Sequence, residues 1–111
     1  MKKFQLVLVD LNPTRGSEIN KVRPCVVVSP DVINHAMKTI IVAPLTSTIP
    51  RTLPTRILIK ATSDNRLTND SYAVLDQIKT IDKSRITGIL GEISESEKLE
   101  ITDTLLELFA Y

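Results

Sequence analysis

The chain has 111 residues, 42% hydrophobic and 4% aromatic, with a formal net charge of +1. This length fits one domain over residues 1–111, whose modest core would be stabilised by homodimerisation. Cys25 is the only cysteine, so neither an internal disulfide nor a thiolate metal cluster is possible within one chain, and a reducing, cytoplasmic setting is expected. Asp10 interrupts the first apolar run, so we expect neither a signal peptide nor a membrane helix.

Charge is distributed unevenly along the chain. Residues 1–91 carry 13 Lys and Arg against 7 Asp and Glu, whereas residues 92–111 carry 1 against 6. The basic part offers a surface for an anionic ligand, and the acidic tail is expected on another face because it would repel that ligand. Ordinary solvated charge accounts for the counts equally well, so the asymmetry alone identifies no ligand.

Short aliphatic and β-branched runs, bounded by Pro, Gly, Asn and Asp, predict a series of small strands. In chain order these are residues 4–11, 25–29, 39–44, 56–60, 71–75, 78–81 and 86–93, with a helical turn at 31–37. The second strand is expected to follow Pro24 and the third to end at Pro44. Ser94 and Glu97 form a capping box before an amphipathic helix, whose apolar stripe comprises Leu99, Ile101, Leu105, Leu106, Leu108 and Phe109.

These elements predict a mostly β fold, a small curled sheet or barrel of about six or seven strands with one C-terminal helix packed on it. No glycine-rich phosphate loop is present, so ATP or NAD is not expected as a cofactor. No spacing of His, Cys, Asp and Glu matches a metal-ligand set, and no metal site is predicted. His35 is the only histidine and is taken as structural, and Cys25 is predicted to be a core residue rather than a nucleophile.

The connection between the first two predicted strands is long, charged and jointed at Gly16, and such loops are often functional. It carries Glu18 and ends at Arg23, directly before Pro24. A lone loop carboxylate such as Glu18 is more often simply solvated, whereas an arginine at the mouth of a strand can hold a phosphate with its bidentate fork. Alternatively, the two residues form a surface salt bridge with each other.

Polar side chains also stand at later strand ends. Thr46 and Ser47 can donate hydroxyl hydrogen bonds to a phosphate, although hydroxyls at such positions usually form turns. Asp76 and Gln77 interrupt two apolar runs, and they can either read base edges or cap a tight turn. The residues alone favour neither interpretation.

Four segments, in similar order and spacing, resemble the MazF/PemK toxin family: VDLNPTRGSE at 9–18, RPCVVVSP at 23–30, VAPLTS at 42–47 and DQIKTID at 76–82. They cover most of the first 90 residues, and the C-terminal helix matches in position rather than in sequence. Some PemK-type members carry an arginine where this chain has Val74, which disfavours a mechanism that uses that arginine.

The resemblance implies an endoribonuclease that needs no metal and cuts single-stranded mRNA at short sequences, leaving a 2′,3′-cyclic phosphate and a 5′-hydroxyl. It also implies a homodimer of SH3-like, CcdB-like barrels and an antitoxin whose acidic, disordered segment fills the basic groove. The residues that match the family's catalytic positions are Glu18, Arg23 and Thr46.

Such a reaction needs a base, a group that stabilises the charged phosphorane and a proton for the leaving oxygen. We expect Glu18 to be the base and Arg23 to hold the non-bridging oxygens with Thr46 as a further donor; water and Arg23 both remain open as the acid. The residues expected to bind RNA are Arg15, Lys21, Ser47, Arg51, Asp76, Gln77 and Lys79.

A competing class is a toxin of the CcdB type, which inhibits DNA gyrase by binding and shares this barrel, so fold alone does not separate the two. The discriminating feature is the set of Glu18, Arg23 and Thr46, which a nuclease needs and a gyrase binder does not. The presence of Glu18 and Arg23 also disfavours an inactive interaction module.

Overall fold

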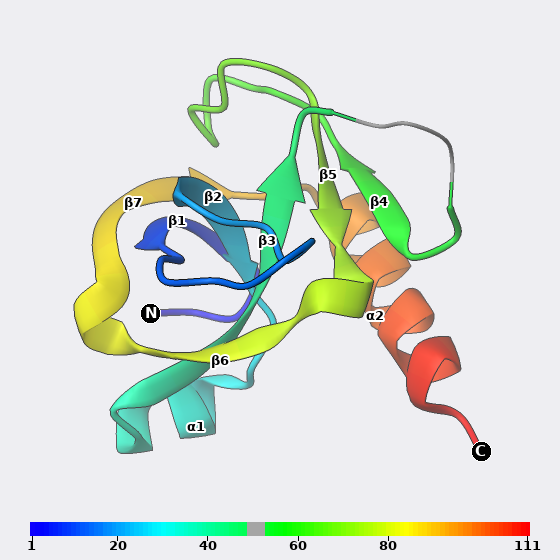
Figure 1. The fold of residues 1–111 in the computed structure, drawn as a ribbon. Helices are drawn as coiled ribbons and strands as arrows, with labels where there is room; N and C mark the ends of the chain where they lie inside the picture. Colours follow the sequence, from blue (N-terminus) through cyan, green and yellow to red (C-terminus); the bar gives the residue numbers. More distant parts are fainter. Residues whose placement is uncertain (49–52) are drawn as a thin grey trace.

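The computed structural model describes residues 1–48 and 53–111. Within these ranges, seven strands form one antiparallel sheet (Figure 1). The strands are β1 (Gln5–Asp10), β2 (Val22–Val27), β3 (Thr39–Thr46), β4 (Arg56–Ile59), β5 (Ser71–Val74), β6 (Lys79–Asp82) and β7 (Ile86–Glu92). The helices are α1 (Asp31–Ala36) and α2 (Glu95–Phe109), and two 3-10 turns are η1 (Leu75–Gln77) and η2 (Lys83–Arg85). The predicted mostly β fold with a C-terminal helix is confirmed.

Strand β3 is the centre of the sheet, whose order is β4-β5-β3-β2-β1-β7. One edge of β3 pairs with β2. Its other edge pairs first with β6, from Thr39 to Val42, and then with β5, at Leu45 and Thr46. The C-terminal end of β3 therefore emerges between β2 and β5, and the chain that follows it lies beside the loop from β1 to β2.

Both proline boundaries predicted from the sequence are wrong, because β2 begins before Pro24 and β3 continues past Pro44. Val28 N–H donates to the Ile41 carbonyl at 2.9 Å, so by alternation the nitrogen of Pro44 faces away from β2. It points to the edge of β3 where the neighbouring strand changes from β6 to β5. The pairing of β2 with β3 starts at Cys25, so Pro24 lies one residue outside it. Each missing N–H thus falls at the end of a ladder, where a proline is tolerated.

The core consists of two clusters that draw on alternate residues of the central strands, as expected for a sheet buried on both faces. The first contains Leu6, Val26, Val28, Ala43, Leu45, Ile57, Ile59, Ala73, Leu75, Ile93 and Ile101. The second contains Val7, Val9, Leu11, Cys25, Val27, Ile40, Val42 and Ile81. Cys25 is fully buried, which confirms its prediction as a core residue.

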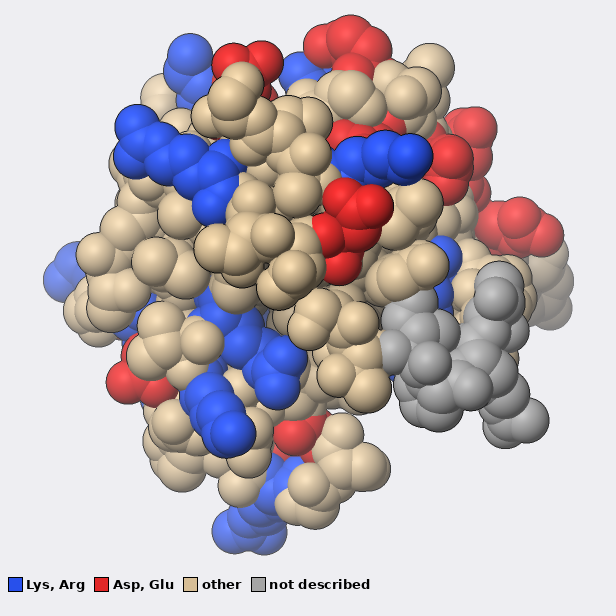
Figure 2. All heavy atoms as spheres, turned by 90° about the horizontal axis from the view of Figure 1, so that it is seen from above, with Lys and Arg blue, Asp and Glu red and all other residues tan. Residues whose placement is uncertain are grey.

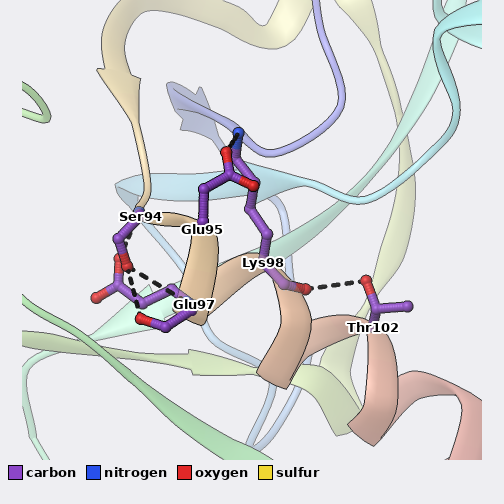
Figure 3. Close-up of polar contacts among 6 residues, drawn as sticks. Ser94, Glu95, Glu97, Lys98 and Thr102 are labelled. Atoms are coloured by element: carbon purple, nitrogen blue, oxygen red, sulfur yellow. Dashed lines mark hydrogen bonds and ion pairs between the residues drawn. The ribbon is translucent and has the colours of Figure 1, made fainter.

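Helix α2 begins with the predicted capping box (Figure 3). The Glu97 carboxylate accepts the N–H of Ser94 at 2.8 Å, and Glu97 N–H donates to Ser94 Oγ at 3.3 Å. Lys98 Nζ pairs with Glu95 at 2.9 Å in the same turn. The two bonds between Ser94 and Glu97 satisfy backbone N–H groups that have no partner within the helix, so the sequence specifies the start of the helix.

The apolar stripe of α2 is only partly used by the core. Ile101 is fully buried and Leu105 packs against the first cluster, but Leu99, Leu106 and Phe109 are 65%, 68% and 68% exposed. The helix therefore packs on the sheet, as predicted, but through only part of the apolar stripe. Among the described residues, no helix has the length and hydropathy needed to cross a membrane.

Candidate active site

The loop between β1 and β2 is closed at its base. Leu11 N–H donates to the Lys21 carbonyl at 3.0 Å, and Lys21 N–H donates to Asn12 Oδ1 at 3.2 Å. The Arg85 guanidinium donates to the carbonyls of Asn12 and of Asp10, the latter at 3.1 Å. Lys21 takes a left-handed φ of 71°, which returns the chain into β2. The loop is thus anchored where it leaves and rejoins the sheet.

Glu18 lies near the tip of this loop and is bound to Arg15 in both directions. Its Oε1 accepts the Arg15 N–H at 2.6 Å, and its own N–H donates to the Arg15 carbonyl at 3.1 Å. Both residues are exposed. The contact orients the carboxylate through one oxygen and leaves the second with no partner among the described residues. A carboxylate in this arrangement can take up a proton as a general base.

The tip of the loop is joined to η1. Ile19 N–H donates to Gln77 Oε1 at 2.9 Å, and the Ile19 side chain packs against the second core cluster. Between loop and η1 lies a hollow of about 370 Å³, lined by Ser17, Glu18, Ile19, Pro44, Asp76, Gln77, Ile78 and Lys79. Four of the predicted site residues, namely Glu18, Asp76, Gln77 and Lys79, therefore surround one space.

Arg23 and Thr46 lie on neighbouring strands. The ladder of β2 and β3 runs from Val27 with Val42 to Cys25 with Pro44, so Arg23 and Thr46 each lie two residues beyond its last pair. Arg23 Nε donates to the Asn20 carbonyl at 2.7 Å, which orients the guanidinium and leaves its terminal nitrogens without a partner among the described residues. Thr46 Oγ1 accepts the N–H of Thr48 at 3.2 Å. An oriented guanidinium and a hydroxyl at neighbouring strand ends are groups suited to holding a phosphate.

Arg23 borders a second hollow of about 340 Å³, together with Ser47 and, across from them, Arg66, Thr68, Asn69 and Ser71. Arg66 brings a second guanidinium to this space and takes a left-handed φ of 56°. Arg66 was not predicted as a site residue, because no motif surrounds it. It lines the same hollow as Arg23 only because a loop distant in sequence folds over the sheet.

The two hollows lie on opposite sides of the end of β3. Pro44 lines the first, whereas Leu45 and Ser47 line the second. The salt bridge between Glu18 and Arg23 that the sequence allows is not formed, because each is engaged by the backbone instead. Arg23 and Thr46 thus both lie just beyond the paired part of β2 and β3, whereas Glu18 borders the hollow on the other flank of the strand end. A polymeric substrate laid across this end can contact both flanks.

Cys25 lies beneath this region. Burial raises the pKa of its thiol from 9.0 to about 12, although the positive charges of Lys79 and Arg23 act in the opposite direction. A thiol that keeps its proton is a poor nucleophile, so the chemistry of the site falls to its neighbours. The strand registers place Lys79 opposite Val42 and Cys25 opposite Pro44, so Lys79 of β6 and Arg23 of β2 lie toward the same end of the sheet.

The other residues predicted to bind RNA differ in their contacts and in their exposure to solvent. Asp76 accepts a hydrogen bond from Thr55 Oγ1 at 2.9 Å and forms an ion pair with the Arg56 guanidinium, so its carboxylate is held by a distant segment and, within the described part of the chain, caps no turn of its own. Lys79 is half-buried, and Lys21 and Ser47 are exposed. Arg51 lies outside the described residues. Arg56, the partner of Asp76, was also missed, because its pairing spans 20 residues of sequence.

Opposite charges gather on different parts of the surface. In Figure 2 most acidic side chains of this face gather toward the upper right, whereas Lys and Arg lie mainly over the left and the centre, from the top to the bottom of the view. Within residues 1–48 and 53–111, no group of three or more His, Cys, Asp or Glu side chains is placed to hold a metal ion.

Comparisons with known proteins agree on one family. The family model described as "PemK-like, MazF-like toxin of type II toxin-antitoxin system" matches residues 2–109. A protein of Staphylococcus epidermidis named endoribonuclease MazF is 36% identical over 106 residues, covering 95% of this chain and 88% of that protein. Its namesake in Staphylococcus saprophyticus is 34% identical with the same coverage.

Solved structures match over nearly the whole chain. The crystal structure of MazF from Deinococcus radiodurans has a TM-score of 0.84 at 23% identity and covers 100% of this chain and 97% of its own, which supports the fold. An endoribonuclease from a mycobacterial species, in complex with its cognate antitoxin, has a TM-score of 0.78 at 26% identity and covers 96% and 92%. The chain therefore belongs to the family of PemK-like, MazF-like toxins of type II toxin–antitoxin systems.

Proposed function

We propose that the protein is a toxin with endoribonuclease activity, which cleaves single-stranded RNA at short sequences without a metal ion and leaves 2′,3′-cyclic phosphate and 5′-hydroxyl ends. The observation that carries this proposal is that Arg23 and Thr46 follow directly on the last β2–β3 pair, Cys25 with Pro44, while Glu18 and Pro44 line one hollow at the same strand end. Relatives over 30% identical along 95% of the chain are named endoribonuclease MazF, which supports the reaction class and does not favour the gyrase-binding alternative.

In the proposed reaction Glu18 removes the proton of the 2′-hydroxyl, whose oxygen attacks the phosphorus. The bond from phosphorus to the 5′ oxygen breaks, and water donates the proton that this oxygen needs, because a guanidinium group does not readily give up its own. Arg23, oriented through Nε, binds the non-bridging oxygens with its free terminal nitrogens, and Thr46 adds a donor. Losing one such contact typically costs ~3–4 kcal/mol of transition-state stabilisation.

Substrate binding is proposed to depend on the cations around the two hollows. Lys79 borders the hollow of Glu18, and Arg15 and Lys21 are exposed on the loop beside it. Ser47 borders the hollow of Arg23. Because each phosphate contact releases counterions, RNA binding should weaken as salt increases. Aromatic stacking contributes little, since 4% of residues are aromatic.

We further propose that the protein acts in the cytoplasm as a homodimer and is inhibited by an antitoxin. One solved relative is in complex with its cognate antitoxin. The exposed cations Arg15 and Lys21 of the loop, with Lys79 at the hollow of Glu18, suit an acidic, disordered segment of such a partner, which would occupy the site of RNA and so block cleavage.

The proposal is tested by incubating the purified protein with a long single-stranded RNA in the presence of EDTA. Wild type, Glu18→Ala and Arg23→Ala are compared, with Glu107→Ala as a matched control, since Glu107 is an exposed carboxylate on α2. New 5′ ends are mapped and tested for a hydroxyl by their ability to accept a phosphate from polynucleotide kinase.

Cleavage at one short sequence, retained by Glu107→Ala and lost in the two site variants, is the expected result. It would establish the activity and its specificity in one experiment. If folded, dimeric wild type leaves the RNA intact, the nuclease proposal is wrong, and inhibition of DNA gyrase becomes the next measurement.

A further inference from the structure

Gln77 and Ile19 are 58 residues apart in sequence and are joined by a single hydrogen bond of 2.9 Å. A backbone N–H can only donate, so the atom of Gln77 that faces Ile19 must be the amide oxygen. Gln77 is half-buried, and the bond ties the residue next to Glu18 to η1. From this contact we infer that Gln77 is a positioning residue for Glu18, an inference that rests on the proposed nuclease function.

The turn that carries Gln77 is itself firmly held. Leu75 is fully buried, and its N–H donates to the Thr55 carbonyl at 3.0 Å. Asp76 is fixed by Thr55 Oγ1 and by the Arg56 guanidinium. Gln77 therefore extends from a rigid base, which is the requirement for a residue that positions another.

The loop has few other contacts that fix its tip. The bonds between Glu18 and Arg15 are internal to the loop, so they orient the carboxylate relative to the loop and not relative to the sheet. Gly16, with a φ of +57° and nothing within 4 Å of an added Cβ, is a point at which the loop can flex. The packing of Ile19 and its bond to Gln77 therefore fix the position of Glu18 relative to the sheet.

The same contact limits what Gln77 can do with a base. An amide that reads adenine uses its oxygen and its nitrogen together. Here the oxygen already accepts the Ile19 N–H with one of its two lone pairs, and the NH₂ group has no partner among the described residues. A base read by Gln77, as expected from the sequence, would share this oxygen with the tether.

The experiment compares Gln77→Met, Gln77→Glu and Gln5→Met. The first removes the acceptor while keeping side-chain length, and the second keeps an oxygen for Ile19 N–H. Gln5 is the matched control, since its Oε1 accepts the Lys2 N–H at 3.2 Å far from the candidate site. Two quantities are measured: kcat and KM for RNA cleavage, and the hydrogen-exchange rate of the Ile19 amide by NMR without RNA.

Gln77→Met is expected to speed Ile19 exchange and to lower kcat by about 10- to 100-fold, because small misplacements of a catalytic group have effects of this size. Gln77→Glu should restore slow exchange and most of kcat, while its added charge raises KM. Gln5→Met should match wild type in both measurements.

A Gln77→Met variant with raised KM, unchanged kcat and a protected Ile19 amide would identify Gln77 as a base reader and overturn the inference. Failure of Gln77→Glu to restore Ile19 protection would overturn it as well. Hydrogen exchange is measured without RNA, so it tests the bond between Gln77 and Ile19 even if wild type cleaves no RNA. Absence of cleavage by wild type would refute the nuclease proposal and not the existence of this bond.

Discussion

Arg15 and Glu18 hold each other through two hydrogen bonds of opposite direction, one from the Arg15 N–H to the Glu18 carboxylate and one from the Glu18 N–H to the Arg15 carbonyl. The first is 2.6 Å long, which is short for an N–H donating to an oxygen. Glu18 is therefore oriented within its loop before any substrate arrives. This preorganisation is what a general base requires.

Glu18→Gln is expected to fold normally but to cleave RNA about 10²- to 10⁴-fold more slowly. The new amide oxygen can still accept the Arg15 N–H, so the loop keeps its shape while the basic oxygen is lost. Single-turnover cleavage rates of the variant and of Glu107→Gln give the measurement and its control. A cleavage rate of Glu18→Gln within a few-fold of the wild-type rate would show that Glu18 is not the general base.

Arg23→Lys is expected to lower kcat by about 10²- to 10³-fold, with a smaller change in KM. The guanidinium is oriented by the bond from Nε to the Asn20 carbonyl, and an ammonium group cannot hold that bond and also present a bidentate fork to phosphate. Steady-state cleavage assays separate the two parameters. If KM rises while kcat stays constant, Arg23 binds the ground state and the transition state equally, contrary to the proposed role.

Local sequence patterns predicted the strands and the start of α2, because alternation of apolar residues and capping chemistry act within a few residues. They failed at Pro24 and Pro44, where the cost of a proline depends on which edge its nitrogen faces, and hence on partner strands. The periodicity of α2 likewise shows which residues share a face but not how much core is present to cover Leu106 and Phe109.

The candidate site also combines residues that local motifs predicted with contacts that they did not predict. Glu18, Arg23 and Thr46 were found from local motifs and from the resemblance that those motifs carry. The contact between Ile19 and Gln77, the pairing of Asp76 with Arg56 and the approach of Arg66 to Arg23 were not found. Each depends on segments brought together by the sheet, and a single sequence gives no signal for such contacts.

The stability of the protein relative to Cys25→Ala is expected to fall as pH rises from about 9 toward 12. Burial raises the pKa of the native thiol to about 12 from 9.0, so in this window the unfolded chain has lost the proton and the native one keeps it. The unfolded state binds fewer protons, and the free energy of unfolding should drop by up to ~1.4 kcal/mol per pH unit. Below pH 9 the difference between the proteins should be constant.

Urea unfolding of both proteins at a series of pH values measures this difference. Comparing wild type with Cys25→Ala cancels the titration of Lys and Tyr, which both proteins share. Parallel stability curves up to pH 11 would mean that the thiol ionises as easily in the folded state as in the unfolded chain, and that water reaches it.

Gly91→Ala is expected to destabilise the fold by about 3 kcal/mol. A Cβ at this position, where φ is +155°, would lie 2.0 Å from the Asp64 carbonyl oxygen. The turn that carries this carbonyl cannot easily move, because Asn65 is 1% exposed and its side chain bonds the backbone of Lys60, Thr62 and Leu67.

Gly88→Ala is the matched control, since it lies in the same strand, β7, and an added Cβ would meet only Leu8 Cδ1, at 3.7 Å. Its stability should equal that of wild type or exceed it by about 0.5 kcal/mol, because alanine loses less backbone entropy on folding. Free energies of unfolding from urea titrations compare the two variants. Equal stability of both would contradict the close approach of the 62–65 turn to β7, whereas a large loss confined to Gly91→Ala would support it.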